Sequence, residues 1–88
     1  MILQIDKTQD VPKGLPTTLK SDYIDNVIRT THVERGVKVH LADGTVLSLE
    51  YDMGGRLAFY NYLTDYSEYS ISQVYLLNNE GKTLKKLF

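Results

Sequence analysis

The sequence predicts an α+β fold, in which a small antiparallel β-sheet packs with one short helix. Alternating apolar and polar residues on either side of turn sequences predict two β-hairpins, over residues 26–51 and 70–88. Apolar residues at helical spacing place the helix near residues 56–66. Strands and helix are segregated along the chain, which is typical of an α+β protein with an antiparallel sheet; a small open barrel is the alternative closure. With 88 residues, we expect one domain spanning residues 1–88.

The first third of the chain predicts short strands and one long connection. Residues 2–5 are apolar enough for a short strand, whereas residues 7–20 contain two prolines and a glycine and predict a loop or an extended edge segment. Residues 21–31 carry a helical apolar stripe, but they are also rich in β-branched side chains. We therefore expect a helical turn or an irregular start near residues 21–25, followed by a strand from about residue 26 to residue 33.

The clearest hairpin joins residues 37–41 to residues 45–51. Both segments alternate, and Gly44 in the left-handed region fits a three-residue turn with a bulge. The predicted cross-strand pairs are Leu41 with Thr45, Val39 with Leu47, and Val37 with Leu49. These side chains share one mainly buried face, and the opposite face is mainly polar.

Residues 34–36 have the same form as the turn that ends at Gly44, because both end in glycine. The same geometry would pair Val33 with Val37 and Thr31 with Val39, which adds a third strand. His32 and His40 then become diagonal neighbours on the polar face. Lys38 lies between them and the spacing matches no structural zinc pattern, so we expect no metal site.

The predicted helix depends on Phe59, Leu63 and Tyr66, which are spaced i, i+4, i+7. The alternating residues 59–62 could form a strand instead. Two glycines and an arginine before this segment lack the remaining residues of a phosphate-binding loop, so a tight turn is the simpler interpretation.

The C-terminal hairpin consists of an apolar segment, a turn and a lysine-containing return. Residues 70–77 are strand-like, residues 78–81 are Asn-Asn-Glu-Gly, and residues 82–88 return with apolar and basic side chains. The Asn/Gly-rich turn is a strong signal for a reversal of the chain.

Composition excludes several classes of protein. The net charge is -1, so the basic excess of a dedicated duplex-DNA binder is absent. The chain has no cysteine, which excludes disulfides and thiolate metal ligands and favours a cytoplasmic location. The first residues do not match a signal peptide, and no apolar run approaches the ~20 residues of a membrane span. No catalytic or cofactor motif is present, so we expect a non-enzymatic protein without a cofactor.

The candidate site is a tyrosine-rich, acidic segment. Five of the seven tyrosines lie between residues 51 and 69, where acids outnumber the single arginine. Tyrosine combines a large apolar body with a polar tip and is enriched in protein interfaces. The predicted protein-binding residues are Tyr51, Arg56, Tyr60, Tyr62, Asp65, Tyr66, Glu68 and Tyr69. We expect an inhibitor or adaptor that occludes a protein partner with a basic surface, of the kind found among small accessory and phage-encoded proteins.

Two other functions remain open. A small core with exposed strand edges favours a self-associating structural protein, and thus a homo-oligomer. Lys82, Lys85, Lys86 and Tyr75 would suit a weak single-stranded nucleic-acid binder, although nucleic acid is the less favoured partner because the clustered tyrosines lie among acids.

Overall fold

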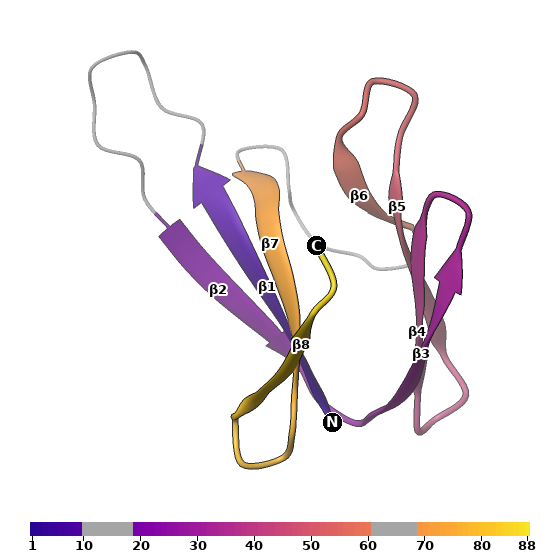
Figure 1. Ribbon diagram of the computed structural model, residues 1–88, viewed down its shortest axis with the longest axis vertical. Coiled ribbons are helices and arrows are strands. Elements are labelled where there is room, and N and C mark those ends of the chain that lie inside the picture. The colour runs from indigo at the N-terminus through magenta and orange to yellow at the C-terminus, as the bar shows by residue number, and fades with distance from the viewer. Residues whose placement is uncertain (10–18, 61–68) are drawn as a thin grey trace.

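The protein folds into two four-stranded antiparallel β-sheets (Figure 1). The computed structural model describes residues 1–9, 19–60 and 69–88. The strands are β1 Ile2–Gln9, β2 Leu19–Ile24, β3 Val27–Val33, β4 Gly36–Leu41, β5 Val46–Tyr51, β6 Leu57–Tyr60, β7 Tyr69–Leu77 and β8 Thr83–Lys86. One sheet has the order β2-β1-β7-β8 and the other the order β3-β4-β5-β6. The described residues contain no helix, so the α+β prediction is wrong and the fold is all-β.

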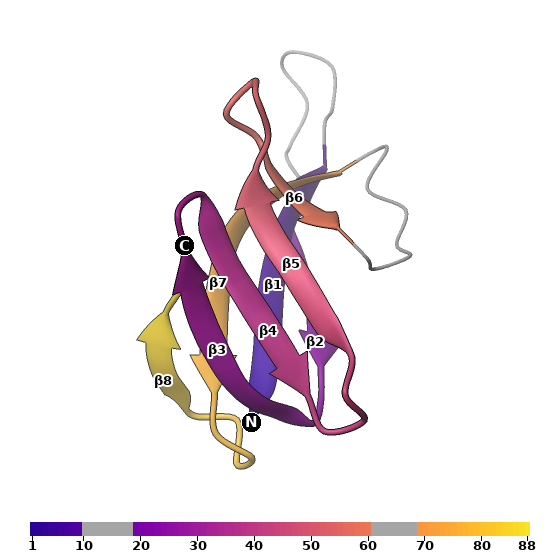
Figure 2. The same ribbon diagram turned by 90° about the vertical axis from the view of Figure 1, so that its right-hand side faces the viewer.

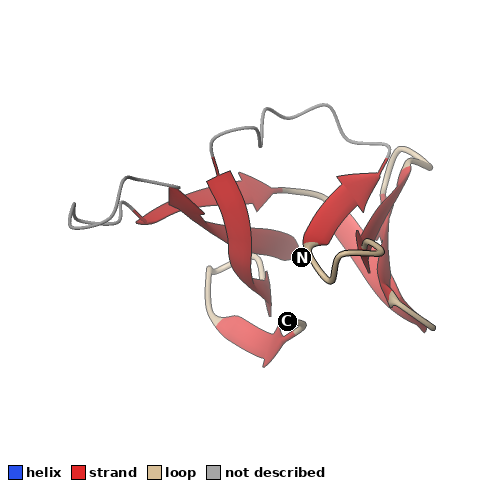
Figure 3. Cartoon of the chain, turned by 90° about the horizontal axis from the view of Figure 1, so that it is seen from above, coloured by secondary structure: helices blue, strands red, loops and turns tan. Residues whose placement is uncertain are grey.

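The two sheets lie face to face as two layers and diverge toward one end (Figures 1 and 2). Seen from above, they form two separate layers rather than a closed barrel (Figure 3). The core fills the space between them. Its fully buried members with the largest side chains are Leu3, Ile5, Leu47, Leu49, Val27, Val37, Val39 and Val74. These residues come from both sheets, because each strand directs alternate side chains inward.

The meander β3-β4-β5 confirms the predicted hairpins over residues 26–51. Val39 pairs with Leu47 and Val37 with Leu49, as the alternation predicts. Gly44 has a φ of 91°, and its N–H donates to the Leu41 carbonyl in the turn. The side chains predicted to share the apolar face of this hairpin are largely buried.

The predicted register between β3 and β4 is wrong by one residue. Val33 pairs with Gly36 rather than Val37, and Thr30 rather than Thr31 pairs with Val39. The turn contains two residues, because Gly36 belongs to β4 and not to the turn. Glycine is required there by the close approach of β5, since a Cβ at Gly36 would lie 2.0 Å from the Leu49 carbonyl oxygen.

The segment predicted as a helix begins as strand β6. Leu57 pairs with Tyr51 and Phe59 with Leu49. Both Leu57 and Phe59 pack against the core, so their period is two rather than 3.6. The rest of the predicted helix, residues 61–66, lies outside the described residues.

The helical turn or irregular start predicted near residues 21–25 is also wrong, because a strand runs through most of this segment. Residues up to Ile24 form β2, in which Tyr23 is exposed and Ile24 is buried. Asn26, with a φ of 63°, then turns the chain into β3 in the other sheet. Met1 stabilises this corner, since its N-terminal amine donates to the Val27 carbonyl and its carbonyl accepts from the Val27 N–H.

The C-terminal hairpin is confirmed as β7 and β8. The Asn78 carboxamide oxygen accepts hydrogen bonds from the N–H groups of Glu80 and Lys82, and Gly81 has a φ of 86°. On its other edge β7 pairs with β1, and a bulge interrupts this pairing at Ser72. Strand β1 is therefore longer than the predicted residues 2–5 and lies inside its sheet, between β2 and β7.

Candidate binding cleft between the sheets

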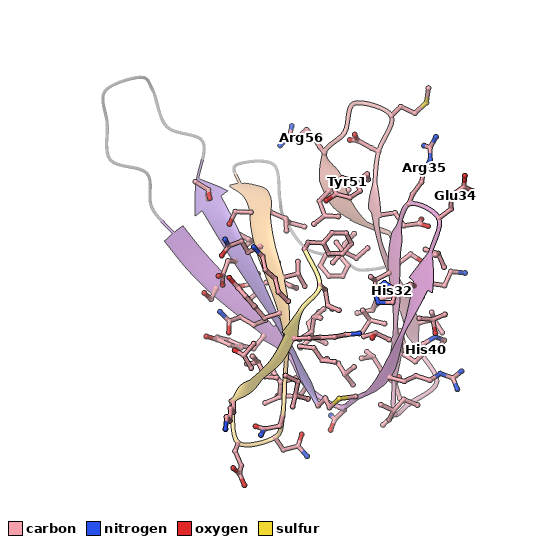
Figure 4. All side chains as sticks on the ribbon, in the orientation of Figure 1. His32, Glu34, Arg35, His40, Tyr51 and Arg56 are labelled. Carbon is pink, nitrogen blue, oxygen red and sulfur yellow. The ribbon has the colours of Figure 1, made fainter. Side chains whose placement is uncertain are left out.

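A cleft of about 310 Å³ lies between the two sheets. It is lined by Tyr51, Gly55, Arg56, Leu57, Ile71, Ser72 and Phe88. The first four come from β5, β6 and the turn between them, and the other three come from β7 and the end of the chain. Figure 4 shows Tyr51 and Arg56 near the end where the sheets are farthest apart, on the side that faces the opposite sheet.

An aromatic pair spans the cleft. The rings of Tyr51 and Phe88 meet edge to face, with centroids 5.5 Å apart and an interplanar angle of 79°. Phe88 is held against β7, because its carbonyl accepts from the Val74 N–H and its N–H donates to the Val74 carbonyl. Tyr51 remains 45% exposed, so a large part of its ring is available for contact with another molecule.

The turn between β5 and β6 fixes the position of Arg56. One carboxylate oxygen of Asp52 accepts hydrogen bonds from the N–H groups of Gly54 and Arg56, both at 2.9 Å. The Asp52 N–H donates to the Arg56 carbonyl at 2.8 Å, and Gly55 adopts a φ of 81°. The Asp52 carboxylate is thus engaged by the backbone of the turn, and this turn places Arg56 at the cleft.

The opposite wall depends on the bulge in β7. Asp6 pairs with Gln73 and Lys7 with Ile71, so Ser72 has no partner in the ladder. The Ser72 hydroxyl instead donates to the Asp6 carbonyl at 3.0 Å, which fixes the extra residue. Ile71 and Ser72 therefore both reach the cleft, although they are adjacent in sequence.

Lys7 and Asp22 form an ion pair near this wall of the sheet. The Lys7 side chain is only 9% exposed, whereas that of Asp22 is 41% exposed. Because Lys7 follows the inward-facing Leu3 and Ile5 at intervals of two, its stem extends the inner face beyond the apolar core.

The structure brings two of the eight predicted site residues together, Tyr51 and Arg56. The backbones of Tyr60 and Tyr69 belong to β6 and β7, and their side chains are outside the described set. Tyr62, Asp65, Tyr66 and Glu68 lie outside the described residues altogether. The acidic half of the predicted patch therefore stays a prediction.

Sequence reasoning missed most of the cleft. Leu57, Ile71 and Phe88 line it, and each is an apolar residue in a strand or beside one. Alternation alone would have placed them on the inner face, but it does not distinguish a side chain that fills the core from one that lines an opening.

A second cavity of about 360 Å³ lies at the opposite corner and is lined by Asp25, Asn26, Leu41, Ala42 and Asp43. Hydrogen bonds from Thr45, through its side chain and its backbone N–H, hold the pKa of Asp43 below its ordinary value. Asp43 is thus a structural carboxylate of the β4–β5 turn.

The histidines do not form the predicted diagonal pair, because the register is shifted. His40 lies opposite Arg29, and its Nε2 is 3.0 Å from the Thr31 hydroxyl, while His32 lies opposite Val37. Within residues 1–9, 19–60 and 69–88, no three carboxylate or imidazole side chains gather as metal ligands would.

Comparison with known proteins gives no relative: no family model, curated protein or solved structure matches this chain. In the part of the chain that the structure describes, no helix has the length and apolar character to cross a membrane.

Proposed function

We propose that the protein is a non-enzymatic protein-binding module and that the cleft between its sheets holds a side chain of the partner. The observation that carries this proposal is the Tyr51–Phe88 pair, which lines an open cleft beside Arg56 instead of being enclosed by the core. Tyrosine and arginine are, with tryptophan, enriched at the energetically dominant positions of protein interfaces.

The size of the cleft limits its occupant. A volume of about 310 Å³ lies at the low end of the range for small-molecule pockets, roughly 300–1,000 Å³. A single large apolar side chain of the partner suits this space, with its ring or branched chain packed on Tyr51, Phe88 and Ile71. The binding mode is steric: the module covers the segment that carries this anchor.

The charge of the cleft favours particular residues next to the anchoring side chain of the partner. Among the described lining residues, Arg56 is the one charged side chain. A carboxylate next to the anchor on the partner would approach this guanidinium, and arginine recognises carboxylates through two parallel hydrogen bonds. The partner segment that we propose is therefore apolar and acidic. The expectation of a basic partner surface depends on the acids of residues 50–69, which are Glu50, Asp52, Asp65 and Glu68. Asp65 and Glu68 lie outside the described residues.

Selection from a library of displayed random peptides tests this function. We expect selected peptides to share an aromatic or aliphatic anchor with a neighbouring acid. Their binding should weaken by about fivefold or more in Tyr51→Leu and Arg56→Gln, since interface anchors of this kind contribute more than about 1 kcal/mol. The matched controls are Tyr23→Leu and Arg35→Gln, which change exposed side chains that do not line the cleft.

The proposal fails if no peptide is enriched, or if the cleft variants and the controls lose affinity equally. Circular dichroism of each variant shows whether it is folded, and thus distinguishes a loss of binding from a loss of the fold. Calorimetry with a selected peptide should also give a negative heat-capacity change, which is the signature of apolar surface burial on binding.

A further inference from the structure

The outer face of the sheet β2-β1-β7-β8 carries a row of side chains that the cleft does not use. Tyr23 on β2 pairs with Gln4 on β1, Gln4 pairs with Tyr75 on β7, and Tyr75 pairs with Lys86 on β8. Directly opposed residues in antiparallel strands point to the same side of the sheet. The four side chains therefore form one row across all four strands.

This row faces away from the core. The neighbouring row, Ile24, Leu3 and Leu76, is buried between the sheets. Because side chains alternate along each strand, the Tyr23 row must lie on the opposite face. Figure 1 shows that the other sheet covers only one side of this sheet.

The two tyrosines are placed to present their rings to a ligand. Tyr23 is 58% exposed. The Tyr75 hydroxyl donates to the side-chain oxygen of Gln73 at 2.6 Å, and Gln73 lies two residues back on the same strand. The Tyr75 ring therefore lies along β7, over the sheet, instead of projecting away from it. One intervening strand puts the two tyrosines about 10 Å apart, given the usual spacing of about 4.8 Å between strands.

Positive charge borders this row on one side. Lys86 is exposed in β8, and Lys82 is exposed in the turn before it. Lys85 pairs with the buried Leu76 and therefore belongs to the opposite, inner face. Asp6 is the acid of β1 that shares the outer face, and it is only 7% exposed. Its carboxylate accepts hydrogen bonds from Gln4 and Ser21, so it is engaged within the sheet. The exposed side chains of this face are therefore Tyr23 and Lys86, with the apolar Leu84 beside Lys86, and the adjoining turn carries Lys82 and Glu80.

We propose that this face binds single-stranded nucleic acid, as a second surface separate from the protein-binding cleft. Two unpaired bases stack on Tyr23 and Tyr75, and the nucleotide between them lies over Gln4. Lys82 and Lys86 neutralise the phosphates along the β8 edge. Stacking on aromatic side chains tolerates any base, so the binding is insensitive to sequence and requires unpaired bases.

The test is fluorescence anisotropy of the full chain with a labelled oligo-dT of about 12 nucleotides, at about 50 mM salt. We expect saturable binding and a preference for the single strand over the duplex of the same length. Two phosphate contacts predict a slope of about −1.4 in a plot of log affinity against log salt, at about −0.7 per contact for single strands. Tyr23→Leu should weaken binding by about tenfold, and Lys86→Gln should weaken it and reduce the steepness of the slope.

Matched controls are Tyr51→Leu, in the cleft, and Lys38→Gln, an exposed lysine of the other sheet; both should bind the oligonucleotide as the unchanged protein does. The proposal is overturned by a lack of saturable binding, by a preference for duplex, or by equal losses in variants and controls. It is also overturned if sedimentation shows a dimer that Tyr23→Leu dissociates, because the face then belongs to a second copy of the chain. This assay measures oligonucleotide binding and uses no peptide, and the cleft enters it only through a control variant, so the two proposals can fail independently.

Discussion

Gly36 provides the sharpest test of the structure, because its role differs from that of the turn glycines. It lies in β4, and an added Cβ would meet three backbone atoms of β5: the Leu49 carbonyl oxygen at 2.0 Å, the Glu50 Cα at 2.8 Å and the Leu49 carbonyl carbon at 3.0 Å. Backbone atoms cannot rotate away as a flexible side chain can. Substitution by alanine therefore has to push the two strands apart.

The size of the effect follows from this overlap. Contacts below 3.0 Å are essentially never seen for a real Cβ, so relieving the contact at 2.0 Å requires a shift of about 1 Å. Such a shift weakens the pairing of Gly36 with Glu50 and the nearby hydrogen bond from the Tyr51 N–H to the Arg35 carbonyl. Each backbone hydrogen bond contributes about 1 kcal/mol net, and forced repacking costs about 1–3 kcal/mol. Gly36→Ala should therefore lower the free energy of unfolding by about 2–4 kcal/mol, a large part of the ~4–13 kcal/mol typical for this length.

Urea denaturation monitored by circular dichroism measures this loss, with Gly44 as the matched control. Gly44 has a φ of 91° and open space around its Cβ position. Gly44→Ala should therefore lower the free energy of unfolding only by the cost of holding an alanine in the left-handed backbone conformation, about 1–2 kcal/mol. Gly44→Asn should cost less than Gly44→Ala, since asparagine tolerates this region, whereas Gly36→Asn should be at least as damaging as Gly36→Ala. If Gly36→Ala is no worse than Gly44→Ala, Gly36 is a turn glycine and the register between β3 and β4 is incorrect.

Three further predictions concern the ion pair, the aromatic pair and the β4–β5 turn. Asp22→Asn should lower the free energy of unfolding by about 1–2 kcal/mol, because it removes the carboxylate facing the buried Lys7 ammonium. The double variant that also carries Lys7→Met should regain part of this stability, and urea denaturation measures both changes. Phe88→Ala should cost about 1–2 kcal/mol, and a double-mutant cycle with Tyr51→Ala should give a coupling of about 0.5–1.5 kcal/mol; additive losses would argue against the edge-to-face contact. The pKa of Asp43 is lower in the folded state than in the unfolded state, so its contribution to stability is present above its ordinary pKa of 3.8 and is lost as the pH falls through the folded value. The stability difference between Asp43→Asn and the unchanged protein should therefore shrink in acid, and a difference that is constant with pH would contradict this linkage.

The hairpins could be predicted from sequence because their signals are local. Alternation around Gly44 determines the register of β4 and β5, and the Asn/Gly-rich turn determines the reversal between β7 and β8. The register of β3 could not be predicted in the same way. A glycine required by the close approach of a neighbouring strand resembles a turn glycine until the position of that strand is known.

The error at residues 57–60 has a different cause. Phe59 begins an i, i+4, i+7 series and also belongs to an alternating run, so a short apolar segment satisfies both periods. Pairing with β5 decides between them, and pairing is a tertiary interaction. The cleft depends on tertiary structure in the same way. The tyrosine-rich, acidic composition of residues 51–69 predicts Tyr51 and Arg56 as binding residues. Phe88 becomes their neighbour only because β7 and β5 lie in facing sheets.

The position of β1 determines the order in which the two sheets can form. Strands β3 to β6 follow one another through short turns, so their sheet can assemble from neighbouring segments alone. Strand β1 instead requires β7 as a partner, and the hydrogen bond from Ser72 to Asp6 joins residues 66 positions apart. Loop closure over such a distance is slow, so we expect the β3–β6 meander to form early and the pairing of β1 with β7 to limit the folding rate. During synthesis β1 can pair only with β2 until β7 has been added, so its second edge stays open to aggregation until then.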